Sequence, residues 1–265
     1  MIARRLLDSG PLCGALGAAG LVGAWEAAGR TGFISPTVFP RASAVLSRAA
    51  GLAADAGFLS CVVSTLGAWA IGLLLTVAVA VPAGFLLGTL PGLERAFGPV
   101  FEFLRPIPSV ALIPPALVLF SDKVDMKITL IVYAASWPVL INTMYGLKEV
   151  DPLAKETLRA FGFGPAAVLW RVSLPSTAPF IAAGVRLAAA VALIVGISVE
   201  FLAGGAGGSG IGVFLIEAGG ATDALEYIVA AALWAGVIGY LSNGLFVLAE
   251  RRAFRWHTAR TEVAR

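Results

Sequence analysis

Charged residues are scarce in this sequence. Asp, Glu, Lys and Arg make up 13% of the 265 residues, whereas apolar residues make up 58% and the mean hydropathy is +0.89. A soluble domain usually has about 25% charged residues. So few polar side chains cannot cover a water-soluble globule, and the apolar content is too high for a disordered chain. Lipid is therefore the expected surrounding of most of the chain.

Cysteine and histidine are nearly absent as well. Cys13 and Cys61 lie in or beside apolar runs, and His257 is the only histidine. These numbers exclude a disulfide scaffold, a thiolate metal cluster and histidine-based acid–base chemistry. We expect both cysteines to be small packing residues, and we predict neither a catalytic residue nor a metal site.

Patterns for nucleotide and nucleic acid binding are also missing. The sequence has no G-x-x-x-x-G-K-[ST] motif for ATP phosphates and no basic patch interleaved with aromatic residues. Gly205, Gly207 and Gly210 formally match G-x-G-x-x-G, but they follow an apolar helical segment rather than a strand, so we interpret this run as a turn. We therefore expect no cofactor on this chain and no nucleic acid partner.

Long apolar runs are what the sequence does have. A membrane-crossing helix needs about 20 mostly apolar residues, so the runs predict an all-α polytopic membrane protein with one domain over residues 1–265. Six transmembrane helices are predicted at about 9–28, 60–89, 99–121, 127–147, 176–202 and 226–249. Pro82 predicts a kink in the second helix, and Gly84 and Gly88 form a G-x-x-x-G packing motif. Glu102 and Arg105 are predicted to pair at the membrane interface.

The distribution of basic residues predicts the orientation. Six crossings place both termini on one side, and 13 of the 19 Lys and Arg residues fall on that side. Since basic loops stay in the cytoplasm, both termini are predicted to be cytoplasmic. Arg4 and Arg5 before an apolar run also fit a signal peptide, but Ala24–Arg30 offers no convincing cleavage site, so we expect a retained first helix. On the outside, a short surface helix is predicted over Arg41–Ala56, with one apolar face formed by Val45, Leu46, Ala49 and Leu52.

Four polar residues within the apolar runs are candidates for a translocation pathway. They are Ser136, Asn142, Arg186 and Glu200. Polar groups at membrane depth are costly and each needs a partner or a role. Ser136 and Asn142 fit either hydrogen bonds between helices or a pathway lining, and Arg186 fits either a snorkelling or a paired side chain. Glu200 fits a cavity or gate, or an interfacial carboxylate that accepts hydrogen bonds from the glycine-rich backbone after it.

The segment between the fourth and fifth predicted helices, residues 151–175, has the pattern of a helix–turn–helix. Asp151 and Pro152 are suited to the start of a helix, and Gly162 is suited to its C-terminal stop, where a positive φ is needed. Gly164 and Pro165 open a second short helix, which Leu174 and Pro175 are predicted to end. The segment has apolar side chains but no soluble mass of its own to cover them, which indicates a docking surface for a partner.

At this point the sequence resembles the membrane permease subunit of bacterial binding-protein-dependent ABC importers. The signature of that family is E-A-A, three residues, G, nine residues, then I-x-L-P. This chain has Glu156-Thr157-Leu158, Gly162 and Val172-Ser173-Leu174-Pro175 at the same spacing. The resemblance extends to the branch that takes up nitrate, sulfonate, taurine and bicarbonate, through Arg105-Pro106-Ile107-Pro108, Ala111-Leu112-Ile113-Pro114, Gly184-Val185-Arg186-Leu187, Glu200 and Ser35-Pro36.

The resemblance implies a type I ABC importer fold in the bacterial inner membrane and a mechanism that needs other chains. Two permease copies, expected to be a homodimer, form the pathway; two separate ATPase subunits hold ATP and Mg; and an extracytoplasmic binding protein delivers the solute. The segment 151–162 would be the coupling helix. The residues expected to contact the ATPase are Glu156, Thr157, Leu158, Arg159, Ala160, Phe161, Gly162, Leu174 and Pro175.

The same resemblance implies a substrate class. A small organic or inorganic anion is expected, such as an aliphatic sulfonate, taurine or nitrate, and a pyrimidine vitamin precursor or an aromatic acid is the alternative. Two other classes of protein compete with the permease. An ion-gradient-driven transporter would show internal repeats and several deep carboxylates, and an intramembrane enzyme would need a nucleophile and a base at depth. Neither pattern occurs here, so we expect a transport subunit rather than an enzyme.

Overall fold

A computed structural model describes residues 10–33, 35, 39–204, 208–221 and 223–254. The regular elements in these ranges are helices. Five of them are long and apolar enough to cross a membrane, and a bent pair brings the number to six if it counts as one span. The spans are α2 (Gly10–Arg30), α4 (Ala56–Thr89), the pair formed by α5 (Pro91–Leu104) with Ser109–Leu119, α7 (Lys123–Lys148), Pro165–Leu202, which includes α10 (Leu174–Leu202), and α12 (Ala224–Ala253). The all-helical membrane fold predicted from the sequence is thus confirmed.

The chain divides into two compact units. One contains Met1–Leu59 and Phe214–Ala235, and the other contains Ser60–Val213 and Gly236–Arg265. The single domain expected from the sequence stays a prediction.

In the first unit, a short helix packs through the apolar face that its sequence indicates. Helix α3 (Ala42–Leu52) buries Val45, Ala49 and Leu52, whereas Leu46, expected on the same face, is exposed. Leu46 lies only one position after Val45, which is about 100° around the helix, so the two cannot share a narrow buried stripe. The predicted residues Ser35-Pro36 lie partly outside the described residues, because only Ser35 is described.

Polar contacts join the segments of this first unit. The Arg48 guanidinium donates to the Tyr227 hydroxyl at 3.0 Å and lies 3.2 Å from the Asp223 carboxylate. The Trp234 indole N–H donates to the carbonyl of Ala49 at 2.9 Å. These bonds tie α3 to the residues that begin α12.

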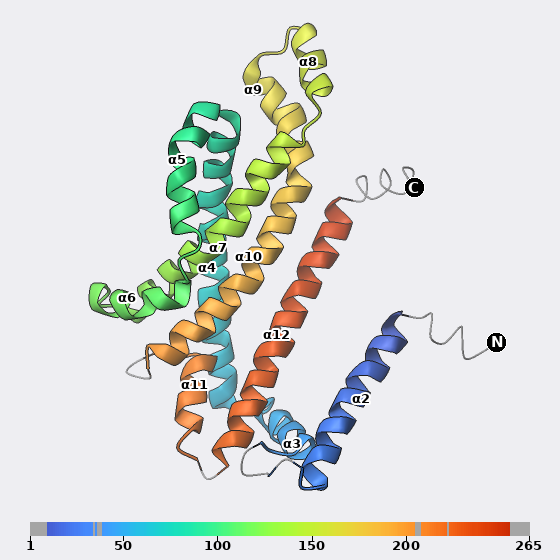
Figure 1. Cartoon of the computed structure of the whole chain (residues 1–265), viewed down its shortest axis with the longest axis vertical. Coiled ribbons are helices and arrows are strands. Elements are labelled where there is room, and N and C mark those ends of the chain that lie inside the picture. Colours follow the sequence, from blue (N-terminus) through green and yellow to red (C-terminus); the bar gives the residue numbers. More distant parts are fainter. Residues whose placement is uncertain (1–9, 34, 36–38, 205–207, 222, 255–265) are drawn as a thin grey trace, which may run out of the picture. The chain divides into compact units, whose positions relative to one another are not determined.

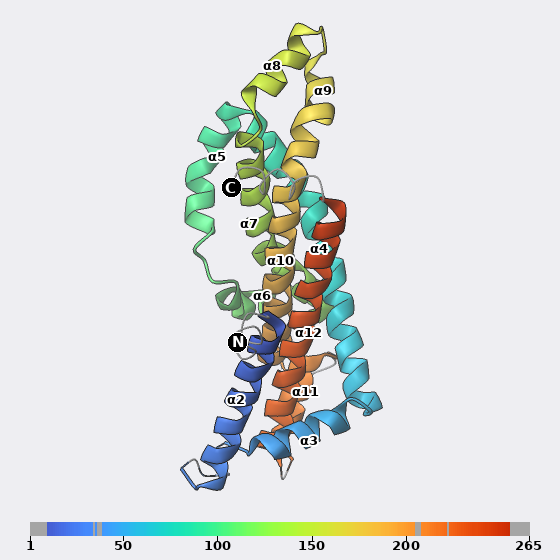
Figure 2. The same cartoon turned by 90° about the vertical axis from the view of Figure 1, so that its right-hand side faces the viewer.

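In the second unit, α4, α7 and α10 form the core. Helices α7 and α10 run antiparallel and lie side by side in Figure 1 and Figure 2. Buried residues of all three helices, among them Leu73, Ile131, Val139, Ala188 and Ala192, form one cluster. The many small residues at these positions allow the helix backbones to approach closely, as is usual in membrane bundles.

The predicted G-x-x-x-G motif packs α4 against α7. A Cβ added at Gly84 would lie 2.7 Å from Thr143, and one added at Gly88 would lie 2.8 Å from Leu147. In both pairs the contacting residues are 59 positions apart in the sequence. A constant separation means that α4 and α7 run parallel, so each has its first residues at one end of the unit and its last residues at the other.

The third predicted crossing, 99–121, is not one helix. Helix α5 ends at Leu104, a 3₁₀ turn covers Ser109–Leu112, α6 covers Ile113–Leu119, and the two halves meet at 81°. Pro106 and Pro108 cause the break, because proline lacks an N–H and disfavours a helical residue before it. The Tyr133 hydroxyl donates to the carbonyl of Leu104 at 2.9 Å, which also accepts the N–H of Ile107.

The break also changes the surroundings of Arg105. This residue is the C-cap of α5, and no ion pair joins it to Glu102, although both belong to the described residues. The predicted pair between Glu102 and Arg105 is therefore wrong. Arg105 still has helical backbone angles and its N–H donates to the carbonyl of Phe101, so the spacing is kept but the two side chains do not meet.

The predicted helix end at Leu174 and Pro175 is also wrong. Helix α9 (Pro165–Val168) continues through a π-turn at Leu169–Ser173 directly into α10, which begins at Leu174. Pro175 lies in the first turn of α10. Proline has no N–H to donate, and the wider hydrogen-bond spacing of the π-turn accommodates this missing donor. The helix therefore continues past Pro175.

Candidate functional site

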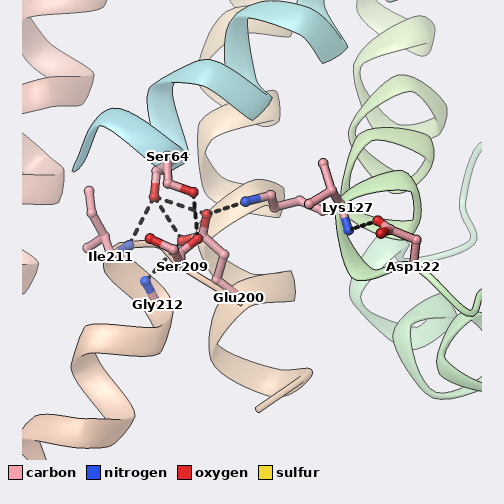
Figure 3. Close-up of polar contacts among 9 residues, drawn as sticks. Ser64, Asp122, Lys127, Glu200, Ser209, Ile211 and Gly212 are labelled. Carbon is pink, nitrogen blue, oxygen red and sulfur yellow. Dashed lines mark hydrogen bonds and ion pairs between the residues drawn. The ribbon is translucent and has the colours of Figure 1, made fainter. Parts of the chain in front are cut away.

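Glu200 lies at the end of α10, where its carboxylate is enclosed by donors from three other segments (Figure 3). The Lys127 ammonium of α7 is 2.9 Å from Oε1, and the two side chains are only 7% and 3% exposed. The Thr65 hydroxyl of α4 lies 2.9 Å from Oε2, and the backbone N–H of Gly212 donates to the same oxygen at 3.0 Å. A buried carboxylate is tolerated only when it is paired and hydrogen-bonded in this way.

Thr65 extends this cluster to α11 (Ile211–Ala218). Its hydroxyl accepts a hydrogen bond from the N–H of Ile211 at 2.9 Å, while its own proton is available to Glu200. The first N–H groups of a helix have no partners within the helix. Glu200 and Thr65 satisfy two of them, so the cluster fixes the start of α11 to α4, α7 and α10.

Glycine is required where α11 approaches Glu200. A Cβ at Gly212 would lie 2.4 Å from the carbonyl oxygen of Ile197 and 2.5 Å from the backbone N of Phe201. These are backbone atoms of α10, so no side-chain rotation relieves the contact. Gly212 is therefore a close-packing residue, and Gly205 and Gly207 of the formal G-x-G-x-x-G match lie outside the described residues.

A cavity of about 400 Å³ opens beside this cluster. Its lining includes Lys123, Lys127, Glu200, Ser64 and Ser209. The Lys123 ammonium donates to the carbonyls of Ala203 and Gly204 at 3.2 Å each, where a cation is favourable at the C-terminus of α10. The cations of this cavity are thus already engaged by the protein.

The other predicted pathway residues do not meet Glu200. Ser136 and Asn142 donate to carbonyls one turn earlier in α7, those of Val132 and Pro138, at 2.6 and 2.8 Å. The Arg186 guanidinium of α10 lies 3.2 Å from the Glu250 carboxylate of α12. The four residues therefore occupy separate places along the bundle, and their roles in translocation stay predictions.

Asn142 instead shares a second cavity with Arg105. This cavity, of about 370 Å³, lies at the break between α5 and α6, and its lining includes Arg105, Trp137, Asn142 and Leu187. Arg105 is the charged residue of this lining, and its guanidinium has no carboxylate within ion-pair distance in the described part of the chain. A cation without a counter-ion can attract an anion to this cavity.

The predicted coupling segment lies at the opposite end of the second unit, beyond the end of α7 (Figure 1). Helix α8 (Pro152–Ala160) begins as expected, because the Asp151 side chain accepts the N–H of Leu153 at 2.9 Å. Gly162 follows the helix with a φ of +83°. The N-cap and the positive φ predicted from the sequence are both confirmed.

Helix α8 presents a mixed apolar and polar face to its surroundings. Leu153 is 68% exposed and Phe161 is 78% exposed, and Glu156, Thr157 and Ala160 are also exposed. Leu158 on the other side of the helix is partly buried. Large apolar side chains exposed in this way mark an interaction surface. Leu174 and Pro175 form the start of α10, and their contact with a partner stays a prediction.

Lys127 and Thr65 are the site residues that the sequence analysis missed. Lys127 is the first residue of the fourth predicted helix and directly precedes the apolar run from Ile128. A charge at the edge of an apolar run is a signal for a buried ion pair with Glu200. Thr65 gives no such signal, because its role depends on how α4 is rotated.

The apolar helices and the exposed hairpin at one end of the bundle define a polytopic membrane subunit that docks to a partner. The chain belongs to the family described as binding-protein-dependent transport system inner membrane component, whose model matches residues 80–255.

Known relatives and a solved structure agree with this class. The bicarbonate transport system permease protein of Synechocystis sp. is 30% identical over 187 residues, 71% of this chain and 66% of that protein. The taurine transport system permease protein of Escherichia coli is 27% identical over 243 residues, 89% of this chain and 86% of that protein. The MetNI methionine ABC transporter in inward-facing conformations has a similar fold, with a TM-score of 0.63, 20% identity, and coverage of 73% of this chain and 94% of that chain.

Proposed function

We propose that this chain is the transmembrane subunit of an ATP-driven ABC importer for a small anion. The observation that carries the proposal is the exposed α8 segment, which combines the family's signature spacing with a face that lacks a partner in the described chain. Such a helix, held in a cleft of an ATPase, can transmit ATP-driven closure to the membrane helices. ATP and Mg then belong to the partner, and this chain has no ATPase site of its own.

The proposed assembly contains two copies of this chain, two ATPase subunits and an extracytoplasmic binding protein. The orientation follows from the basic residues: α8 and both termini face the cytoplasm, while Glu200 lies near the outer surface. Because α4 and α7 are parallel and α10 is antiparallel, Glu200 and α8 lie at opposite ends of the unit. This arrangement supports solute entry near Glu200 and coupling at α8.

The substrate class is inferred from the relatives and from one cavity. The relatives are named for bicarbonate and taurine. Bicarbonate is an anion, and taurine has a sulfonate group. The cavity with Arg105 and Asn142 offers a guanidinium and an amide to such a group. An aliphatic sulfonate, taurine, nitrate or bicarbonate therefore fits better than a pyrimidine vitamin precursor.

Reconstitution tests this proposal. The chain, its genomically neighbouring ATPase and the binding protein are placed in vesicles, and uptake of labelled taurine, nitrate and bicarbonate is measured with and without ATP. We expect uptake that requires ATP and the binding protein and that persists when ionophores remove ion gradients. Uptake that needs an ion gradient and not ATP would establish a secondary transporter instead.

A further inference from the structure

A third cavity, of about 440 Å³, lies between the α8–α9 hairpin and the ends of α4 and α7. Six of its lining residues carry the argument: Thr89, Leu147, Lys155, Arg159, Val168 and Ser173. The cavity is therefore built by the segment that joins the membrane helices to the proposed coupling helix. It is separate from the Glu200 cluster, which lies at the other end of the unit.

The charge of this cavity is positive. Lys155 and Arg159 are the charged residues of its lining, and no carboxylate lines it. They are four positions apart on α8, so the two cations are neighbours on one side of the helix. Like charges at this spacing repel each other unless an anion lies between them. Lys155 makes one long contact, 3.4 Å to the carbonyl of Leu147, and Arg159 has no ion pair among the described residues.

Two further features add hydrogen-bond donors. Ser173 is 6% exposed and lines the cavity, so its hydroxyl is a further polar group of the lining. The helix that runs from Pro165 to Leu202 starts at the cavity, and Gly164 at its N-cap provides no side-chain cap. The free N–H groups and the positive dipole at this end favour an anion.

The cavity is also amphipathic. Leu147, Val168 and Leu169 provide apolar walls beside the cations and the hydroxyl. Lys155 and Arg159 lie about 120° or more around α8 from Leu153, which belongs to the exposed docking face. Lys155 lies outside the residues expected to contact the ATPase and Arg159 belongs to them, so the cavity adjoins the edge of the docking face.

We propose that this cavity binds a phosphate group, supplied by the headgroup of an anionic phospholipid from the cytoplasmic leaflet. Two cations, the Ser173 hydroxyl and a helix N-terminus match phosphate oxygens, and the apolar walls match the glycerol and acyl carbons. The inference rests on the proposed function for one point, that α8 faces the cytoplasm, where anionic lipids are concentrated. The bound lipid fixes α8 against the ends of α4 and α7.

Lipid retention in the purified complex tests the inference. The double variant Lys155→Gln/Arg159→Gln is compared with Arg251→Gln/Arg252→Gln, which removes two exposed charges from α12 outside the cavity. Each complex is purified in neutral detergent at high salt from membranes containing phosphatidylglycerol, and native mass spectrometry counts the retained lipid. We expect about a tenfold loss of bound phosphatidylglycerol in the first variant and none in the control, because charge-assisted bonds to phosphate are lost. Equal retention in the wild-type complex and in both variants would overturn the proposal.

A second arm distinguishes the two sources of phosphate. Complexes in phosphatidylcholine nanodiscs are melted with added inorganic phosphate or with phosphatidylglycerol in the bilayer. Stabilisation by the lipid alone supports the headgroup, and stabilisation by inorganic phosphate without lipid retention would overturn the lipid source. Arg159→Lys keeps the charge and is expected to keep the lipid, which separates loss of the site from misfolding. The single variant Lys155→Gln changes none of the residues expected to contact the ATPase, so it should lose lipid while ATPase pull-down is unchanged. A failure of the lipid inference therefore leaves the proposed function intact.

Discussion

The ammonium of Lys127 lies 2.9 Å from Oε1 of Glu200, and the protein covers both side chains almost completely. The pair joins α7 to α10 at the end of the bundle where α11 starts. Because Thr65 and the N–H of Gly212 complete the shell of Glu200, removal of either charge leaves the other one buried without its partner.

A double-mutant cycle measures this coupling. Glu200→Gln or Lys127→Met alone is expected to destabilise the subunit by about 3–5 kcal/mol, since breaking a buried pair leaves an uncompensated charge. The double variant should lose clearly less than the sum of the two. Thermal unfolding of the detergent-solubilised subunit measures the effect. Additive losses would show that the two charges do not interact.

Gly212→Ala is expected to displace the start of α11 from α10. The new Cβ meets backbone atoms of Ile197 and Phe201 within 2.5 Å, so the helices must separate, at a cost of about 1–3 kcal/mol. Gly236→Ala is the matched control, because that glycine also lies in a helix and has nothing within 4 Å of an added Cβ. Unfolding temperatures should fall for the first variant only. Equal temperatures would mean that α11 does not pack as described.

Gly162→Val is expected to abolish coupling while the subunit still inserts into the membrane. The φ of +83° costs a residue with a Cβ about 1–2 kcal/mol, so the turn between α8 and α9 is distorted. Gly164→Val is the control, since Gly164 has a φ of −70° and open space around it. Substrate-stimulated ATP hydrolysis in vesicles is the measurement. Full stimulation in Gly162→Val would contradict a coupling role for this turn.

Glu156→Lys is expected to weaken ATPase association by reversing a charge on the exposed face of α8. Pull-down of the ATPase should fall at low salt and differ less from the wild type as salt is raised, because salt screens exposed charges. Glu102→Lys reverses an exposed charge on α5 instead and should leave the pull-down unchanged. A salt-independent loss would point to misfolding of α8.

Arg105→Gln is expected to lower anion uptake at unchanged ATPase binding. The substitution removes the cation of the cavity shared with Asn142, whereas Arg105→Lys keeps the charge and should keep most of the uptake. Arg95→Gln is the control, because Arg95 bonds to the carbonyl of Pro91 and is absent from that lining. Normal transport in Arg105→Gln would remove this cavity from the pathway.

Local chemistry made much of the fold predictable. Apolar runs gave the spans, Asp151 and Pro152 gave the start of α8, and Gly162 gave its end. These features depend on neighbours in the sequence. The break after Leu104 and the continuous helix at Pro175 were not predicted. A proline can either break a helix or be accommodated in it, and the packing of the surrounding helices determines the outcome.

The partners of Glu200 could not be predicted for a different reason. Lys127 and Thr65 are 73 and 135 positions away from it. Their meeting depends on the rotation and register of α4, α7 and α10 about their axes. From the sequence alone one can infer that Glu200 needs partners. One cannot infer which helix provides them.

The uninterrupted helix from Pro165 to Leu202 has a mechanical consequence. Its 38 residues span about 57 Å, from the α8–α9 hairpin to the buried carboxylate of Glu200. Its regular hydrogen bonding is altered near the hairpin, by the π-turn at Leu169–Ser173 and by Pro179 inside α10. A displacement of the hairpin therefore either bends the helix in this region or reaches the Lys127–Glu200 pair, so the stiffness of the first turns of the helix determines how far movement at one end of the unit is transmitted to the other.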